Sequence, residues 1–349
     1  MGDYRGAVTV ASPLRLRLDR SALSDNWRAL DRLAGGAACG AAVKADGYGL
    51  GAVEVVRTLA GIGCRDFFVA TWAEAAALAP LGVTVSVLHG VREEDMAVAA
   101  GGIARPVLNT DAQVARWKAA SGGACDVMVD TGMNRLGVSP EAVAGGLLDG
   151  LAIETLMSHL ACADEDSAMN ERQRAAFAGL VGKTSARRMS LANSAAVALG
   201  AGYAFDLVRP GLALYGGVPR PEFADIIRQV VTPEAQILQR RCVAAGETVG
   251  YNATWTASAP TEVAILNIGY ADGYRRAFSG VGSAGGGALP VLGRVSMDLV
   301  AIDVTSRAVI AEGDWVPLDY DLATASIATG VSQYELLTGL RERFERSWF

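Results

Sequence analysis

Residues 39–51 of the chain read Cys-Gly-Ala-Ala-Val-Lys-Ala-Asp-Gly-Tyr-Gly-Leu-Gly. The apolar run 39–43 predicts a buried strand that ends at Lys44, and the glycines after Lys44 allow a tight turn into a helical pattern. The stretch is therefore one strand–turn–helix unit. A lysine at such a strand end is costly to bury, and an amine with a lowered pKa is the group that Schiff-base chemistry requires. The alternative is a lysine whose ammonium reaches water from the strand end.

The same unit recurs through residues 14–225. Seven more short apolar runs follow the first, and most of them lead into alanine- and leucine-rich stretches with helical spacing. Strands that alternate with helices imply right-handed crossovers and a parallel sheet, so eight units predict an α/β fold with a closed (β/α)8 barrel, the TIM barrel. The eight runs end at Lys44, Thr71, His89, Leu108, Asp130, His159, Ala192 and Arg209.

The pattern changes at about residue 226. Residues 226–349 contain short runs rich in β-forming side chains, joined by turns with glycine, aspartate and proline, which predict a mostly-β C-terminal domain. We expect a closing helix at 333–346. The strand-like Leu14–Leu18, within the N-terminal segment 1–18, is a candidate to pair with this second domain.

Composition narrows the class of protein. The 349 residues exceed the size at which one hydrophobic core keeps growing, which favours two domains. The net charge of −6 and the lack of a basic run argue against a nucleic-acid partner. Five scattered cysteines with no Cys-x-x-Cys pair indicate reduced thiols in the cytoplasm, and two histidines leave no histidine-rich metal site to expect. No apolar stretch has the length of a signal peptide or membrane span, so we expect no membrane partner.

Polar residues stand where the predicted barrel strands end. Because a (β/α)8 barrel builds its active site at the carboxyl ends of its strands, these residues are candidates for a catalytic site. Asn, Asp and Ser also prefer turns for local reasons, and that preference explains Asn193 better than it explains Lys44, His159 or Arg209. The residues are Lys44, Asp130, His159, Asn193, Ser194 and Arg209.

Eight motifs in one order make the chain resemble the bacterial alanine racemases, a family that uses pyridoxal 5'-phosphate (PLP). The resemblance covers residues 14–346. It implies interconversion of L-alanine and D-alanine through a PLP external aldimine. The motifs are VKADGYG at 43–49, DTGMNRLG at 130–137, SHLACAD at 158–164, ANSAA at 192–196, RPGL at 209–212, VGYNATW at 249–255, GYADGY at 269–274 and GRVSMD at 293–298.

The resemblance implies two bases on opposite faces of the substrate. Lys44 would hold the cofactor and then serve one face, and Tyr251 would serve the other, because a racemase must remove and return a proton on opposite sides. A tyrosine pKa near 10 is high for this task, and His159 and Arg209 are the candidate cations to lower it. The alternative for Tyr251 is a packed strand tyrosine.

Arg209 matches the family residue that donates a hydrogen bond to the pyridine nitrogen. Arginine keeps its proton, so the cofactor becomes a weaker electron sink and the substrate carbanion regains its proton at Cα, which suppresses transamination. A surface arginine before a Pro-Gly turn is the alternative. The residues that match cofactor-binding positions are Lys44, Tyr48, His159, Asn193, Ser194, Arg209, Gly211, Leu212 and Tyr334.

Arg135, Met297 and Asp298 match residues that bind or organise the substrate carboxylate. An internal ion pair between Asp130 and Arg135 is the alternative, and Ser194 could also be a plain helix cap. In the family, Tyr251 and Met297 come from the partner chain, which implies a head-to-tail homodimer with shared active sites.

One position departs from the family. Many members carry a carbamylated lysine that orients the arginine, and this chain has Met128 there, so another group must hold Arg135. The change affects the geometry of the carboxylate site more than the expected activity.

Several functions are compatible with these residues. Racemisation of serine or of a broader amino-acid set remains open, since a pocket separates close homologues weakly. A non-catalytic PLP-binding protein would normally lack the second domain, and a decarboxylase usually places an acidic residue at the pyridine nitrogen, where this chain has Arg209. Supply of D-alanine as a peptidoglycan precursor is the family's usual task, and a catabolic or inhibitor-resistance role also fits.

Overall fold

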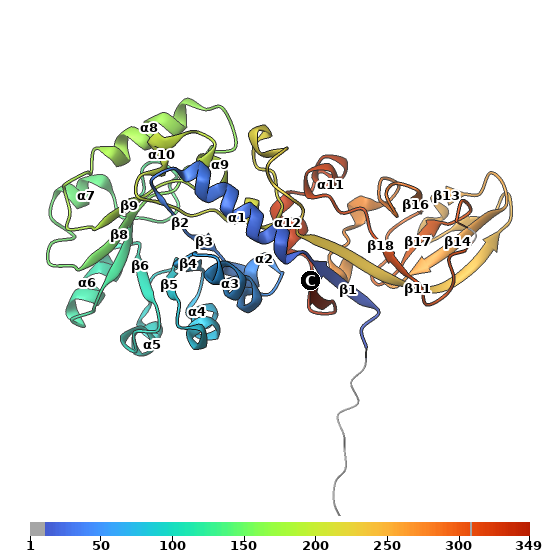
Figure 1. Cartoon of the computed structure of the whole chain (residues 1–349), viewed down its shortest axis with the longest axis horizontal. Helices are drawn as coiled ribbons and strands as arrows, with labels where there is room; N and C mark the ends of the chain where they lie inside the picture. Colours follow the sequence, from blue (N-terminus) through green and yellow to red (C-terminus); the bar gives the residue numbers. More distant parts are fainter. Residues whose placement is uncertain (1–10, 308) are drawn as a thin grey trace, which may run out of the picture. The chain divides into compact units, whose positions relative to one another are not determined.

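The computed structural model describes residues 11–307 and 309–349. They form two compact units, one of residues 19–230 and one that joins the chain up to Leu18 with residues 231–349 (Figure 1). Residues 1–10 of the expected N-terminal segment lie outside the described residues. The boundary between the units falls between Val230 and Val231.

The first unit is the predicted (β/α)8 barrel. Strands β3 to β9 pair in chain order, all parallel, and β10 pairs in parallel with β2. Backbone hydrogen bonds from Arg209 to Ala192 and from Ala42 to Pro210 join β10 to both of its neighbours and close the ring. The strands are β2 (Ala38–Cys39), β3 (Ala41–Ala42), β4 (Asp66–Val69), β5 (Thr84–Val87), β6 (Arg105–Leu108), β7 (Cys125–Met128), β8 (Ile153–Met157), β9 (Arg188–Ser190) and β10 (Leu207–Val208).

Helices cover the outside of these strands (Figure 1). Several begin where the sequence offers a capping side chain: Asp19, Thr71 and Ser139 each accept a hydrogen bond from a backbone N–H of the first turn. The helices are α1 (Arg20–Ala34), α2 (Lys44–Tyr48), α3 (Ala52–Gly61), α4 (Trp72–Leu78), α5 (Met96–Ala100), α6 (Asp111–Ala119), α7 (Pro140–Ala144), α8 (Ala168–Ala178), α9 (Ser194–Val197) and α10 (Ala201–Ala204).

Charged side chains bind one another between the barrel strands, a feature that the apolar pattern did not predict. Arg188 binds both oxygens of Asp66 at 2.7 and 3.0 Å, and the buried carboxylate of Asp126 accepts a hydrogen bond from Ser86 at 2.6 Å. Arg105 lies 3.5 Å from Asp126. A buried charge is tolerated when it is paired and hydrogen-bonded, so this group is a structural ion network.

The second unit is mostly β. Strand β1 pairs antiparallel with the long β11 and parallel with β19, in a sheet ordered β15-β16-β17-β14-β11-β1-β19. Its elements are β1 (Leu14–Leu18), β11 (Val231–Val243), β12 (Thr248–Val249), β13 (Trp255–Thr256), β14 (Thr261–Leu266), β15 (Ser283–Ala284), β16 (Leu289–Leu292), β17 (Val300–Asp303), β18 (Trp315–Pro317), α11 (Leu322–Thr329), α12 (Gln333–Thr338) and β19 (Glu345–Trp348).

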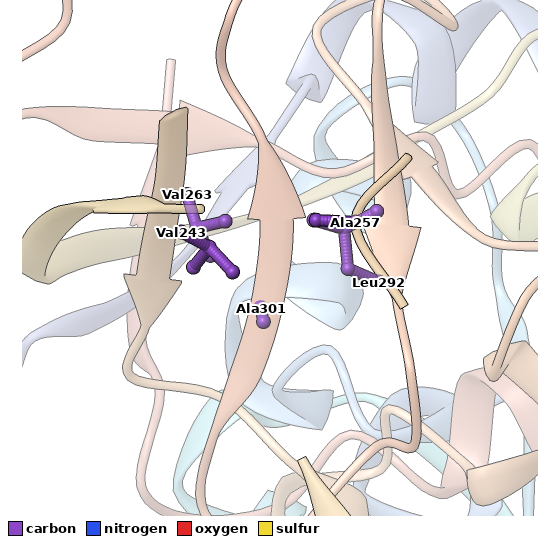
Figure 2. Packing of buried hydrophobic residues seen from close by; sticks show 5 residues of the cluster. All are labelled: Val243, Ala257, Val263, Leu292 and Ala301. Carbon is purple, nitrogen blue, oxygen red and sulfur yellow. The ribbon is translucent and has the colours of Figure 1, made fainter. Parts of the chain in front are cut away.

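The expected closing helix at 333–346 is wrong in its second half. Helix α12 stops at Thr338, and the chain returns to the sheet as β19. The buried Leu340 and Phe344 anchor the connection, and pairing with β1 overrides the helical propensity of the charged residues there. Figure 2 shows the apolar cluster of the sheet, formed by Val243, Ala257, Val263, Leu292 and Ala301.

Candidate active site

The backbone after Lys44 forms a left-handed turn. Residues 45–48 have φ values of 53°, 53°, 63° and 57°, and only the third of them is glycine. The N–H groups of Gly47 and Gly49 donate to the carbonyls of Val43 and Ala45, each at 2.8 Å, as in one turn of a helix of opposite hand. Left-handed helical geometry costs about 1–2 kcal/mol for each L-residue, so surrounding contacts must hold this turn. The sequence predicted only a glycine-rich turn here.

Lys44 lies at the carboxyl end of β3, where its side chain remains accessible to solvent. The surrounding protein still lowers the pKa of the amine by desolvation, and the positive charge of Arg135 lowers it further. The carboxylate of Glu74 acts in the opposite direction. The amine is therefore reachable from water, as a lysine at a strand end would be, and its pKa is also lowered, as Schiff-base chemistry requires.

Arg209, just beyond the end of β10, is buried. Its guanidinium donates to the carbonyl of Ser158 at 2.7 Å and to the hydroxyl of Ser190. Burial lowers its pKa to about 10. Within the described part of the chain no carboxylate forms an ion pair with it, so a buried cation is held by neutral groups. The surface-arginine interpretation is therefore wrong, and N–H donors remain for a ligand.

His159 lies two residues beyond the end of β8. Burial lowers the pKa of its imidazole to about 3, with further lowering by the positive charges of Arg209, Arg135 and Lys44. The ring is therefore neutral near pH 7, and the expectation that His159 supplies a positive charge is wrong for the chain as described. The same charges place three cations and a neutral histidine at one end of the barrel, as the strand ends predicted.

Gln173, on α8, holds the backbone on both sides of His159. Its amide donates to the carbonyl of His159 at 3.0 Å and accepts from the N–H of Ala161 at 2.9 Å. It also donates to Thr131 at 3.4 Å, and so ties the loop after β8 to the loop after β7. The sequence analysis missed Gln173, because a glutamine inside a helical pattern carries no signal of its own.

Ser194 connects the loops that follow β9 and β10. Its hydroxyl oxygen accepts hydrogen bonds from the backbone N–H groups of Gly211 at 2.8 Å and Ala213 at 3.2 Å, which leaves its own proton for another acceptor. The cap of α9 is Asn193, whose side chain accepts from Ala196. The helix-cap interpretation of Ser194 is therefore wrong, and Asn193 fills that role.

Tyr48 lies against the same loop. A Cβ atom on Gly211 would stand 2.2 Å from the Tyr48 hydroxyl, so glycine is required for this approach. The Tyr48 ring stacks on Tyr215 with a centroid distance of 4.7 Å, and the Tyr215 hydroxyl donates to the Ala42 carbonyl. The segments after β3, β9 and β10 thus meet beside the buried Leu212. Their hydroxyl groups and backbone N–H groups can bind an anion there.

Arg135 lies in a loop that Asp130 organises. Burial opposes ionisation of Asp130, but backbone N–H groups lower its pKa, among them those of Gly132, Asn134 and Arg135 at 2.8, 3.1 and 2.9 Å. The carboxylate therefore binds backbone. Among the described residues it forms no ion pair with the exposed Arg135 guanidinium, so the alternative of an internal ion pair is wrong. Met128, at the end of β7, is buried.

The remaining candidates belong to the second unit, where Tyr251, Met297 and Asp298 lie on loops that pack together and Tyr334 lies on α12. Tyr251 is 68% exposed on a short turn after Gly250, which rules out a packed strand tyrosine. A Cβ on Gly293 would stand 2.6 Å from the Val249 carbonyl, and the N–H of Ala271 donates to the Met297 carbonyl at 3.0 Å. The Tyr251 turn, the 293–298 loop and the 269–274 loop therefore support one another.

Asp298 is held by a residue that the sequence analysis did not single out. The guanidinium of Arg343 donates to Asp298 at 2.6 Å and lies 3.3 Å from the buried carboxylate of Asp272. Asp272 in turn accepts from the N–H of Gly269 at 3.0 Å. Met297 and Tyr334 are about half exposed, at 53% and 47%.

Comparisons with known proteins match both units. A family model described as "Alanine racemase, N-terminal domain" matches residues 18–219, and one described as "Alanine racemase, C-terminal domain" matches residues 230–348. An alanine racemase of Acidiphilium cryptum is 42% identical, with 95% of this chain and 97% of the relative covered. One of Methylobacterium nodulans is 43% identical, with 98% and 97% covered.

Among solved structures, an alanine racemase from Bartonella henselae with covalently bound pyridoxal phosphate superposes with a TM-score of 0.89. It is 32% identical, and the match covers 97% of this chain and 100% of that one. The family models span both compact units, and the relatives cover the chain nearly end to end. The chain therefore belongs to the alanine racemase family.

Proposed function

We propose that this protein is a PLP-dependent alanine racemase that interconverts L-alanine and D-alanine. One observation supports it most: a lysine amine with a lowered pKa and a buried arginine without a carboxylate partner occur at the same end of one barrel. An amine of that kind suits a carbonyl cofactor, and a permanent donor suits a ring nitrogen. Family membership points to the same reaction.

The residues present fit the cofactor. Lys44 would hold its aldehyde carbon, and Arg209 would donate to its ring nitrogen. Ser194, Gly211 and Tyr48 would bind its phosphate. The Ser194 hydroxyl has a proton to donate, and Gly211 brings its backbone close to the Tyr48 hydroxyl. When bound, PLP withdraws electrons from the substrate Cα and makes its proton removable. Asn193, Leu212 and Tyr334 complete the cofactor set that we propose, together with the neutral His159.

Proton transfer falls to Lys44 of one chain and to the partner's Tyr251. Lys44 moves a proton on one face of the substrate, and its lowered pKa increases the fraction of amine that can accept one. Tyr251 serves the opposite face, and its exposure on a turn leaves the phenol available. Arg209 keeps its proton and limits how far negative charge spreads into the cofactor, so the proton returns to Cα.

The substrate carboxylate is bound by Arg135 and the Met297 backbone, with Asp298 supporting the latter through Arg343. Arg135 is exposed and no carbamylated lysine is possible at Met128. We therefore propose that the substrate or another anion orients this guanidinium when it binds. A small substrate such as alanine is the expected occupant, and serine is the comparison to test.

We infer a head-to-tail homodimer in which Tyr251 and Met297 act in the partner's active site. Both side chains are exposed in the single chain, as are Val281 and Leu299 in the same unit. Exposed apolar side chains of this kind support a surface that a second chain covers.

The described part of the chain contains no helix long and apolar enough to cross a bilayer. All five cysteines are free thiols, which favours action in the cytoplasm, where D-alanine enters peptidoglycan precursors.

The test is a chiral assay of the purified protein on a panel of L-amino acids, with the visible absorbance of bound PLP recorded on the same sample. We expect D-alanine to form faster than D-serine. Optically stable L-alanine in the presence of bound PLP would disprove the proposal. Lys44→Ala should lose the visible band, whereas Tyr251→Phe should keep it and lose proton removal from L-alanine.

A further inference from the structure

We propose that Glu74 is a positioning residue for Lys44, holding the left-handed turn that follows it and placing a negative charge beside the amine. The inference rests on the proposed role of Lys44. Glu74 lies on α4, the helix after the second barrel strand.

Both oxygens of Glu74 accept hydrogen bonds from backbone. One accepts from the N–H of Ala45 at 2.7 Å, and the other accepts from Ala70 at 2.7 Å and Thr71 at 3.1 Å. Ala45 directly follows Lys44, while Ala70 and Thr71 follow β4. Glu74 therefore fastens the end of the first barrel strand to the end of the second, at the peptide next to the reactive lysine.

The chemistry of this site requires a carboxylate. Three N–H donors converge on two oxygens, so both oxygens must be acceptors. A glutamine would turn its NH2 group towards at least one of these donors and lose a hydrogen bond there. Hydrogen bonds to a charged acceptor are also about twice as strong as neutral ones.

The turn that Glu74 fastens is strained and depends on external contacts. Ala45, Asp46 and Tyr48 each adopt a positive φ that L-residues disfavour. Asp46 holds the far end, since its side chain accepts from the N–H of Ala52 at 2.8 Å. Glu74 holds the near end. Without it, the first peptide of the turn loses its partner, and Lys44 and Tyr48 are no longer fixed relative to each other.

Glu74 also acts on Lys44 through space. Desolvation and Arg135 both lower the pKa of the Lys44 amine, and the negative charge of Glu74 opposes them. Neutralising Glu74 should lower that pKa further. This effect distinguishes positioning of Lys44 from ordinary capping of α4, in which Glu74 also takes part through Thr71.

The sequence makes the measurement direct, because the chain contains only three lysines, Lys44, Lys118 and Lys183. Reductive methylation with 13C-formaldehyde of the full-length, cofactor-free protein gives one dimethylamine signal for each lysine and one for the N-terminal α-amine, which remains in every lysine variant. Lys118→Arg and Lys183→Arg assign the signals. Titration of Lys44 by NMR is then compared in the native chain and in Glu74→Gln, Glu74→Asp and Thr71→Ala.

We expect Glu74→Gln to lower the pKa of Lys44 and to weaken PLP binding by about tenfold or more, from the loss of a charged hydrogen bond. Glu74→Asp keeps the charge but is one methylene shorter. It should preserve the Lys44 titration better than Gln does, while speeding hydrogen exchange of the Ala45 amide. Thr71→Ala removes the cap of α4 and should leave both Lys44 readouts as in the native chain.

An unchanged Lys44 titration in Glu74→Gln, or an equal change in Thr71→Ala, would overturn the proposal. If Glu74→Gln does not fold, Glu74→Asp is the remaining test. Hydrogen exchange of the Ala45 amide at the native rate, together with native PLP affinity, would then overturn the proposal. The assay of racemisation on the native chain is separate. Inactive native protein with the expected Lys44 shifts would refute the proposed function and leave the role of Glu74 standing.

Discussion

The guanidinium of Arg209 donates a hydrogen bond of 2.7 Å to the carbonyl of Ser158, the residue immediately before His159. The arginine after the last barrel strand thereby fixes the end of β8, two strands away in the barrel order. Arg209, which we propose to contact the cofactor, therefore also positions the backbone next to His159, a second proposed cofactor residue. Changes at Arg209 should therefore alter both stability and the course of the reaction.

Replacing Arg209 with glutamine tests its effect on the course of the reaction. In the proposed site Arg209 would oppose protonation of the pyridine nitrogen by its fixed charge, so its loss should divert protonation away from the substrate Cα. We expect slower racemisation and more keto acid for each D-alanine formed, measured by coupled pyruvate detection. Arg220→Gln is the matched control, since Arg220 is also buried but binds Asp166 and Glu222. An unchanged product ratio in Arg209→Gln would contradict the assigned role.

The lowered pKa of His159 predicts a pH dependence of stability. Its ordinary pKa is 6.5 and its pKa in the folded chain is about 3, so between these values the unfolded state binds a proton that the folded state does not. The free energy of unfolding should therefore fall as the pH drops from 6.5 towards 3, by up to about 1.4 kcal/mol per pH unit from this group.

Urea titrations of the cofactor-free protein between pH 4 and 7 measure that slope. His159→Gln should flatten it, and His89→Gln, at the only other histidine, should leave it as in the native chain. Equal slopes for the native chain and His159→Gln would show that the imidazole is charged in the folded state.

Gln173 and Gln113 make matching backbone contacts beside the two histidines. Each amide donates to the carbonyl of one of the two histidines and accepts from a backbone N–H nearby: Gln173 at His159, and Gln113 at His89. Gln173→Leu and Gln113→Leu should each cost about 1–3 kcal/mol of stability, because partners are left unsatisfied. Only Gln173→Leu should also reduce kcat and PLP affinity. Equal activity losses in both would indicate a general structural effect.

Gly211→Ala tests the close approach of Tyr48. The added methyl would stand 2.2 Å from the Tyr48 hydroxyl, so the ring must move and its stacking on Tyr215 must loosen. We expect a loss of about 1–3 kcal/mol in stability and weaker PLP binding, measured by thermal unfolding and by fluorescence titration. Gly36→Ala is the control, because nothing lies within 4 Å of its added methyl. Native PLP affinity in Gly211→Ala would contradict the proposed phosphate site.

The homodimer that we propose, with shared active sites, predicts complementation between two inactive variants. Lys44→Ala and Tyr251→Phe each inactivate both sites of their own dimer. In a mixed dimer, one site receives Lys44 from one chain and Tyr251 from the other and is intact. After exchange at equal concentrations, about a quarter of native activity should return. No recovery in dimers shown to have exchanged would mean that each site is built from one chain.

The barrel was predictable from the sequence because its strands repeat one simple arrangement. Runs such as residues 66–69 and 84–87 are short, rich in Phe and Val and followed by helical spacing, and the structure has β4 and β5 there. The polar residues at the strand ends predict, on the same grounds, the face on which we propose the active site. Local patterns were sufficient where burial and chain order determine the outcome.

Features that depend on distant contacts could not be predicted. Ala45, Asp46 and Tyr48 do not prefer positive φ, and two contacts hold their left-handed turn: Glu74 accepts from the N–H of Ala45, and Asp46 accepts from the N–H of Ala52. The contact between Glu74 and the N–H of Ala45 has no local signature, because it joins positions 29 residues apart. Residues 345–348 form a strand because β1, more than 300 positions earlier, is available to pair.

The pairing of β1 has a consequence for synthesis on the ribosome. Leu14, Leu16 and Leu18 are buried in the finished sheet, but their antiparallel partner β11 begins only at Val231 and their parallel partner β19 at Glu345. More than 200 residues are translated between β1 and β11, which takes about 10 to 40 s at ordinary elongation rates. During that time the leucine face of β1 lacks its neighbours, while the whole barrel is synthesised after it. Nascent chains of this protein should therefore depend on chaperones that shield the N-terminus until the last residues are made.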